Sequence, residues 1–147
     1  MRPVIRRATA DDLPQIAALF SQSRRLLTFL PELHSVEEDR GFIAGLLSSA
    51  DVRVALAADG RPIAMLVEDG DWIDHLYVAP DAIGTGAGSA LLADAQARHD
   101  QLQLWCFADN LRARHFYEAR GFVIAETTDG AGNEARLPDI RYVWSRA

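Results

Sequence analysis

Residues 76–92 read LYVAPDAIGTGAGSALL, in which a β-rich run is followed by three glycines at alternate positions and then by a helical pattern. Glycine adopts positive φ angles readily and lets the backbone approach a ligand closely. The first turn of a helix offers unpaired N–H groups and the positive end of the helix dipole, which together suit a phosphate. This order of elements therefore indicates an anion-binding turn at residues 84–89.

Two common phosphate-binding loops do not fit this turn. A P-loop needs a lysine after its last glycine, and Ser89 follows Gly88 instead. The dinucleotide fingerprint G-x-G-x-x-G needs a third glycine at the position of Ser89. Asp109 lies about 20 residues further on, as that fingerprint requires, but the strand before the turn belongs to a predicted antiparallel meander. The sequence thus disfavours both sites.

The chain before the turn predicts two capped helices and a β-meander. Thr9 with Asp12, and Ser35 with Glu38, have the spacing of capping boxes, so a helix is expected after each pair. Asp-Gly dipeptides between β-rich runs are a strong signal for hairpins, which makes the runs antiparallel neighbours. The expected strands are residues 4–8, 52–57, 62–68 and 72–78, and the Asp-Gly pairs are Asp59-Gly60 and Asp69-Gly70.

The chain after the turn predicts a crossover and a closing hairpin. Residues 89–98 have a helical apolar stripe, and Asn110 is expected to cap a helix that runs to about Arg120, with Gly121 as its left-handed C-terminal cap. A strand, a helix and a strand around the glycine turn indicate a parallel crossover inside a mixed sheet. The remaining expected elements are strands at 102–107, 122–127 and 140–144 and an exposed loop at 129–138.

Length, charge and composition exclude several classes of protein. The 147 residues fit one domain, residues 1–147, and a net charge of −6 disfavours a nucleic-acid partner. Cys106 is the only cysteine, which excludes an internal disulfide framework, and the four histidines show no metal-ligand spacing, so no metal is expected. Without a signal peptide or a long apolar run, we expect a cytoplasmic protein with no membrane partner.

A second motif raises a family resemblance. Residues 109–122, DNLRARHFYEARGF, carry an Asn, an Ala, a Phe-Tyr-Glu and a Gly-Phe at the spacing found in the GCN5-related N-acetyltransferase (GNAT) superfamily. The turn at residues 83–88, IGTGAG, resembles that family's acetyl-coenzyme A loop, Q/R-x-x-G-x-G/A. The resemblance covers nearly the whole chain. It implies an α/β (α+β) GNAT fold, with a mixed, mostly antiparallel sheet of about seven strands flanked by about four helices.

The resemblance also implies a set of coenzyme-binding residues. The coenzyme would lie in a V-shaped opening between the strands at 72–78 and 102–107, with its pantetheine arm along the first strand and its pyrophosphate over the glycine turn. Asn110 would reach the pantetheine, and Tyr117 would lie near the thioester sulfur. The residues implicated are Leu76, Tyr77, Val78, Ile83, Gly84, Thr85, Gly86, Ala87, Gly88, Ser89, Asn110, Ala113 and Tyr117.

One position departs from the family pattern. Ile83 stands where the loop usually has Gln or Arg. The substitution removes a polar side chain from the loop but leaves its backbone donors, which do most of the anion binding. We therefore expect the affinity for acetyl-coenzyme A to be weakened and not abolished.

The implied reaction needs an acid and a route for a proton. A lysine-like amine has a pKa of about 10.4 and must lose its proton before it attacks a carbonyl group. The departing thiolate has a conjugate acid of pKa about 8.5, which a phenol near 10 can protonate. Tyr117 is therefore the expected general acid, the alternative being a structural tyrosine of the core. The backbone N–H of Leu76 or a neighbour could polarise the carbonyl group.

The general base is left open between two side chains and water. His75 has the more suitable ordinary pKa, about 6.5. Asp74 would need burial or a like-charged neighbour to bring its pKa toward neutrality. Without a bulge, Ile73, His75 and Tyr77 would share one face of their strand, and Asp74 and Leu76 the other.

The expected function is direct acetyl transfer from acetyl-coenzyme A to a primary amine. Net negative charge mildly favours a cationic acceptor, but it does not choose between a small amine and a peptide. One alternative is a protein or peptide N-acetyltransferase, and another is a non-catalytic acetyl-coenzyme A sensor. Because members of the family often pair, a homodimer is a further expectation.

Overall fold

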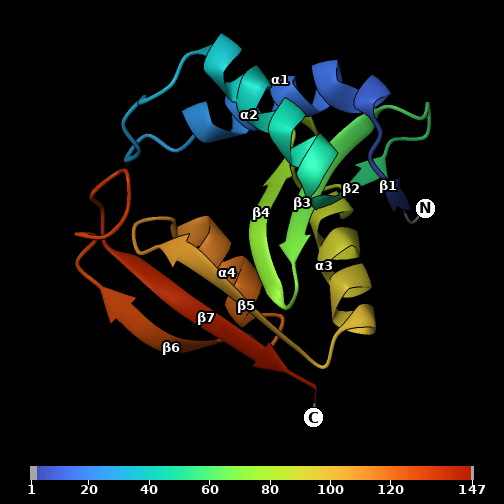
Figure 1. The fold of residues 1–147 in the computed structure, drawn as a ribbon. Coiled ribbons are helices and arrows are strands. Elements are labelled where there is room, and N and C mark those ends of the chain that lie inside the picture. The colour runs from blue at the N-terminus through green and yellow to red at the C-terminus, as the bar shows by residue number, and fades with distance from the viewer. Residues whose placement is uncertain (1–2, 147) are drawn as a thin grey trace.

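The computed structural model describes residues 3–146, which form one seven-stranded sheet with helices on both faces (Figure 1). The sheet order is β1-β2-β3-β4-β5-β7-β6. The mixed, mostly antiparallel sheet with four α-helices confirms the expected fold. The strands are β1 (Val4–Arg7), β2 (Asp51–Leu56), β3 (Pro62–Asp69), β4 (Trp72–Val78), β5 (Gln101–Phe107), β6 (Val123–Thr128) and β7 (Asp139–Ser145). The helices are α1 (Leu13–Arg25), α2 (Val36–Ser49), α3 (Ala87–Arg98) and α4 (Leu111–Glu118), with short 3-10 helices η1 (Ala10–Asp12) and η2 (Pro80–Ala82).

Strands β2 to β4 form the predicted antiparallel meander, and β1 pairs antiparallel with β2. Gly60 and Gly70, which follow the two turn aspartates, have φ angles of 86° and 61°, a region that glycine enters without steric cost. The capping box at Ser35 is confirmed: Glu38 N–H donates to Ser35 Oγ at 3.1 Å, and Ser35 N–H donates to Glu38 Oε1 at 3.0 Å. The corresponding box at Thr9 opens η1, and α1 follows directly.

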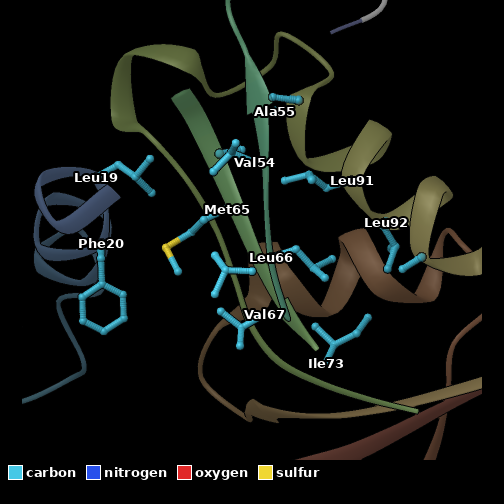
Figure 2. Close-up of a cluster of buried hydrophobic side chains, with 14 of the residues drawn as sticks. Leu19, Phe20, Val54, Ala55, Met65, Leu66, Val67, Ile73, Leu91 and Leu92 are labelled. Carbon is cyan, nitrogen blue, oxygen red and sulfur yellow. The ribbon is translucent and has the colours of Figure 1, made fainter. Parts of the chain in front are cut away.

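The core lies on both faces of β3, which is buried over its first seven residues. Figure 2 shows Leu19 and Phe20 of α1 on one side of the sheet and Leu91 and Leu92 of α3 on the other. This two-sided burial explains why β3 reads as an unbroken apolar run and not as an alternating one.

The helix α3 connects β4 to a parallel β5, as the crossover prediction required. The two strands share a single residue pair, Trp72 with Gln103, next to a hydrogen bond from Gln103 N–H to Asp71 O of 2.9 Å. Beyond this point β5 diverges and pairs along its whole length with β7. The sheet is therefore open between β4 and β5 beyond this pair, toward the C-terminal ends of both strands.

One helix boundary differs from the expected one. The helix after the glycine turn begins at Ala87 and not at Ser89, because Gly86, with a φ of 90°, is its N-cap residue. The helix after Asn110 spans Leu111–Glu118, close to its expected end at about Arg120. Gly121, with a φ of 91°, is the predicted C-terminal cap, and its N–H donates to Glu118 O at 3.3 Å.

A β-bulge also changes the expected faces of β4. Val67 pairs with His75 but Glu68 pairs with Ile73, which leaves Asp74 as the extra residue. Ile73 therefore lies on the α3 side of the sheet (Figure 2), whereas His75 packs against Phe20 on the α1 side. The shared face of Ile73 and His75 was expected only without a bulge, and the bulge places the two residues on opposite faces.

Candidate active site in the cleft between β4 and β5

The opening between β4 and β5 forms a cleft of about 650 Å³. Both strands, the start of α4, the end of α1 and the loop between β6 and β7 line it. Of the residues singled out in the sequence, it brings together Asp74, His75, Leu76, Tyr77, Asn110, Ala113 and Tyr117. Val78 and the glycine turn at residues 83–89 are not part of its wall; they follow directly at the end of β4.

The edge of β4 that faces the cleft carries backbone groups that β3 does not bind. Residues in an antiparallel pair alternate between exchanging hydrogen bonds and not. Ala79 N–H donates to Ile63 O at 2.8 Å, which sets that alternation along β3 and β4. Leu76 and Val78 fall at the other positions, so their N–H and C=O groups point toward the diverged β5. Ser23 Oγ donates to Val78 O at 2.7 Å, a contact that no sequence pattern indicated.

The glycine turn leads directly into the first turn of α3. Gly84 and Gly86 have φ angles of 87° and 90°, and the first hydrogen bond of the helix runs from Ala90 N–H to Gly86 O at 2.9 Å. The N–H groups of residues 87–89 precede that bond and have no acceptor within the helix. A Cβ atom on Gly88 would lie 3.1 Å from a Val78 methyl group, so the glycine at this position favours close packing of the helix on β4. Ile83 is 42% exposed beside the turn.

A cation that the sequence analysis did not single out lies beside this turn. The Arg120 guanidinium is 3.9 Å from the centre of the Phe116 ring and donates to Ser89 Oγ and to Phe116 O. Within residues 3–146 it forms no salt bridge with a carboxylate. It therefore adds positive charge to the first turn of α3, where Ile83 supplies none.

The helix α4 presents three of the predicted residues to the cleft. Asn110 caps the helix by accepting a hydrogen bond from Ala113 N–H at 3.2 Å, as expected. Ala113 and Tyr117 follow at the spacing of one helix face, and all three line the cleft.

The Tyr117 ring is held rigidly while its hydroxyl group stays available. The side chain is 8% exposed and packs edge-on against Phe116 and Phe122, with ring centres 5.3 and 5.5 Å away. Among residues 3–146, no fully buried polar side-chain atom lacks a hydrogen-bond partner. The Tyr117 hydroxyl donates to no protein group in that range, so it opens onto the cleft. Burial raises the pKa of this phenol well above its usual value, with smaller contributions from Cys106 and Tyr77, so it stays protonated.

The two candidate bases have opposite environments. Asp74 is exposed at the bulge and lines the cleft, and desolvation, with the nearby charge of Asp69, raises the pKa of its carboxyl group. The His75 ring packs against Phe42, with ring centres 5.4 Å apart, and burial together with the charge of Arg24 lowers the pKa of its imidazole to about 4. His75 is therefore neutral and a weak base at pH 7.

Neither the Cys106 thiol nor a metal site among the described residues offers a further catalytic group. Cys106 is 7% exposed, and burial raises the pKa of its thiol to about 12, which makes it a poor nucleophile. Residues 3–146 contain no group of three His, Cys, Asp or Glu side chains placed to hold a metal ion. Over the same residues, no helix is long and apolar enough to cross a bilayer.

Comparison with known families fits this geometry. A family model described as "Acetyltransferase (GNAT) domain" matches residues 50–124, from the end of α2 through the glycine turn and α4 to the start of β6. The chain belongs to the GNAT family. The resemblance inferred from the two motifs is thereby confirmed, and the family is one of acyltransferase enzymes.

Individual GNAT relatives match different lengths of the chain. Peptidyl-lysine N-acetyltransferase YiaC of Escherichia coli strain K12 is 35% identical over 87 residues, which span 58% of this chain and 58% of that protein. Peptidyl-lysine N-acetyltransferase YjaB of the same strain is 23% identical over 141 residues, or 95% of this chain and 96% of that protein.

Two solved structures share the GNAT fold of this chain. The solution structure of apo YjaB from Escherichia coli superposes with a TM-score of 0.80 at 23% identity, covering 100% of both chains. A phosphinothricin acetyltransferase from Sinorhizobium meliloti, solved in complex with AcCoA, superposes with a TM-score of 0.74 at 20% identity, covering 99% of this chain and 89% of that one.

Proposed function

We propose that residues 1–147 act as a single N-acetyltransferase domain, which transfers an acetyl group directly from acetyl-coenzyme A to a primary amine. The observation that carries this proposal is the free edge of β4, which joins the glycine turn at one end and faces Tyr117 across the cleft. The names of YiaC and YjaB favour the side chain of a peptide lysine as the acceptor.

The residues present fit acetyl-coenzyme A. Leu76 and Val78 would pair with the pantetheine amides in the manner of an added β-strand. The N–H groups of residues 87–89 and the Arg120 guanidinium would hold the phosphates. Asn110 and Ala113 would border the arm from α4. The coenzyme supplies the acetyl group as a thioester.

The chain's own residues would then manage two protons. Asp74 is the better placed base, because its raised pKa and its exposure to the cleft let it accept the proton of the incoming amine directly or through water. The Leu76 N–H would polarise the carbonyl group. Tyr117, which stays protonated, would donate its hydroxyl proton to the departing sulfur.

A thiol-release assay tests this function. The protein is incubated with acetyl-coenzyme A and either lysine-containing peptides or a pool of small amines, and free thiol is measured together with the mass of the acceptor. Release of thiol with a mass gain on a peptide lysine supports the proposal. Binding of acetyl-coenzyme A without turnover on any acceptor would instead support the non-catalytic sensor.

The choice of base can be read from pH–rate profiles. The Asp74→Asn variant is expected to lose about 10²-fold in kcat/KM, the lower end for a general base. The wild-type profile falls on the acidic side as Asp74 becomes protonated, and this limb should disappear in the variant. The His75→Gln variant serves as the control and should keep the limb. If the acidic limb survives in Asp74→Asn but disappears in His75→Gln, His75 is the general base. If both variants keep the wild-type profile, water is the remaining route for the proton.

Restoring the usual residue of the loop should strengthen coenzyme binding. Because position 83 is exposed, an added guanidinium there is worth about as much as a surface ion pair, so Ile83→Arg is expected to lower the Kd for acetyl-coenzyme A by roughly 2–5-fold. Calorimetric titration measures this, and Ile83→Gln separates polarity from charge. An unchanged Kd in Ile83→Arg would contradict the expectation.

A further inference from the structure

The last turn of α1 carries an arginine that lines the cleft. Arg24 lines the cleft between β4 and β5 and also a smaller adjoining pocket of about 270 Å³, which the segment between α1 and α2 encloses. Its side chain is held in place, since Nη1 donates to the Tyr77 hydroxyl at 3.1 Å and the guanidinium lies 5.5 Å from the centre of the Phe20 ring.

The charge of Arg24 is not compensated. Within residues 3–146, no carboxylate forms a salt bridge with its guanidinium, and its side-chain hydrogen bond goes to a neutral phenol. The nearby carboxylates form salt bridges with the adjacent Arg25 instead: its guanidinium lies 3.3 Å from Glu32 and 3.9 Å from Asp39. Arg25 also meets the preference of a helix C-terminus for a cation, so the helix end does not explain why Arg24 faces the cleft unpaired.

The surroundings of Arg24 favour an anionic ligand. A guanidinium presents its donors in a planar fork that matches a carboxylate, and it is strongest where water is partly excluded. The positive charge of Arg24 acts on β4, where it helps to keep the His75 imidazole neutral. His75 therefore adds no second positive charge at this point of β4.

We infer that Arg24 forms a carboxylate subsite, so that the preferred acceptor carries a carboxylate close to its reactive amine. This inference rests on the proposed function. Asp74, the proposed base, and Tyr77, whose hydroxyl binds Arg24, are three residues apart on β4, or about 10 Å along the strand. An extended lysine side chain can therefore reach Asp74 while a carboxylate near its backbone contacts Arg24. The carboxylate comes either from an acidic neighbour in a peptide or from the free α-carboxylate of lysine.

Four acceptors test the subsite with acetyl-coenzyme A at saturation. A blocked peptide with one lysine between alanines is compared with the same peptide carrying aspartate next to the lysine, and Nα-acetyllysine is compared with its amide. The wild-type protein is expected to show at least a tenfold higher kcat/KM for one carboxylate-bearing member, and which pair differs identifies the source. Arg24→Gln should abolish this preference by raising KM for that member alone, and Arg24→Lys should keep part of it. Arg40→Gln, at an exposed site on α2, is the control and should keep all of it.

The outcomes separate the subsite from a structural role and from the proposed function. Equal kcat/KM for both members of both pairs in the wild-type protein overturns the inference, as does an equal loss on charged and neutral acceptors in Arg24→Gln. If no acceptor is acetylated, the proposed function fails and equilibrium binding of the same two pairs decides the subsite. A carboxylate-bearing member bound at least tenfold more tightly than its neutral counterpart in either pair would then support it, and equal affinity within both pairs would overturn it.

Discussion

Replacing Tyr117 with phenylalanine should lower kcat for acetyl transfer by about 10³-fold while leaving the Kd for acetyl-coenzyme A within about twofold. The variant keeps the ring contacts to Phe116 and Phe122 and removes only the hydroxyl group. Because that hydroxyl opens onto the cleft without a protein partner, its loss should cost little stability. Single-turnover measurements of thiol release, with the Kd determined separately, distinguish the two parameters.

A second tyrosine provides the matched control for Tyr117. Tyr142 is fully buried, its ring centre lies 6.3 Å from that of Tyr117, and its hydroxyl donates to Glu118 at 2.5 Å, away from the cleft. Tyr142→Phe should therefore reduce stability without a comparable loss of kcat. A Tyr117→Phe variant that turns over as fast as the wild-type protein would assign Tyr117 to the core alone.

Replacing Glu68 with glutamine should lower the free energy of unfolding at pH 7 by about 2 kcal/mol. The Glu68 side chain is 4% exposed and pairs with Arg98 of α3 and with His99, whose Nε2 lies 2.9 Å from Oε2. Removing the negative charge leaves Arg98 without this partner, but both partners still reach water, which limits the loss. For a domain of this size the melting temperature should fall by roughly 5 °C.

The contacts of Glu68 also predict how the stability of the protein depends on pH. Burial opposes ionisation of Glu68, but the hydrogen bonds from Arg98 and His99 outweigh it and hold the pKa below its usual range. Because the folded pKa is lowered, the stabilisation is present above the unfolded value of about 4.3 and is lost as the pH falls through the folded pKa. Denaturant titrations should show a constant difference between wild type and Glu68→Gln from pH 7 to 5, and a shrinking one below.

A neighbouring acid on α3 serves as the control for Glu68. Asp94 also contacts Arg98, at 3.1 Å, but its side chain is 31% exposed. Asp94→Asn should therefore cost less than about 1 kcal/mol. If the two variants were equally stable, the burial of Glu68 would have no energetic consequence.

Much of the fold could be predicted because its signals are local. The capping box at Ser35 and the glycines after the turn aspartates are each defined by a pattern of at most four consecutive residues, and the structure confirms them. The crossover through α3 followed from the order of the elements. The start of α3 was misplaced because Ala87 and Gly88 resemble loop residues, although Gly86 already provides the positive φ that begins the helix.

The less predictable features depend on contacts between distant segments. The bulge at Asp74 is a property of its pairing with β3 and leaves no mark in the sequence of β4 itself. Ser23 meets Val78 across 55 positions, and Arg120 meets Ser89 across 31. Arg24 stands out only when the partners of Arg25 are known. Such positions become visible as site residues only in three dimensions.

Because β4 and β5 share a single residue pair, the sheet consists of two blocks that share few main-chain hydrogen bonds. One block contains β1 to β4, and the other contains β5, β7 and β6. A molecule that lies along β4 would act as a temporary strand between these blocks, and its binding free energy would be added to the cohesion of the fold. At a hundred times its Kd such a ligand contributes about 2.7 kcal/mol to stability. Under the proposed function, the resistance of this protein to heat and to proteolysis would therefore follow the supply of acetyl-coenzyme A.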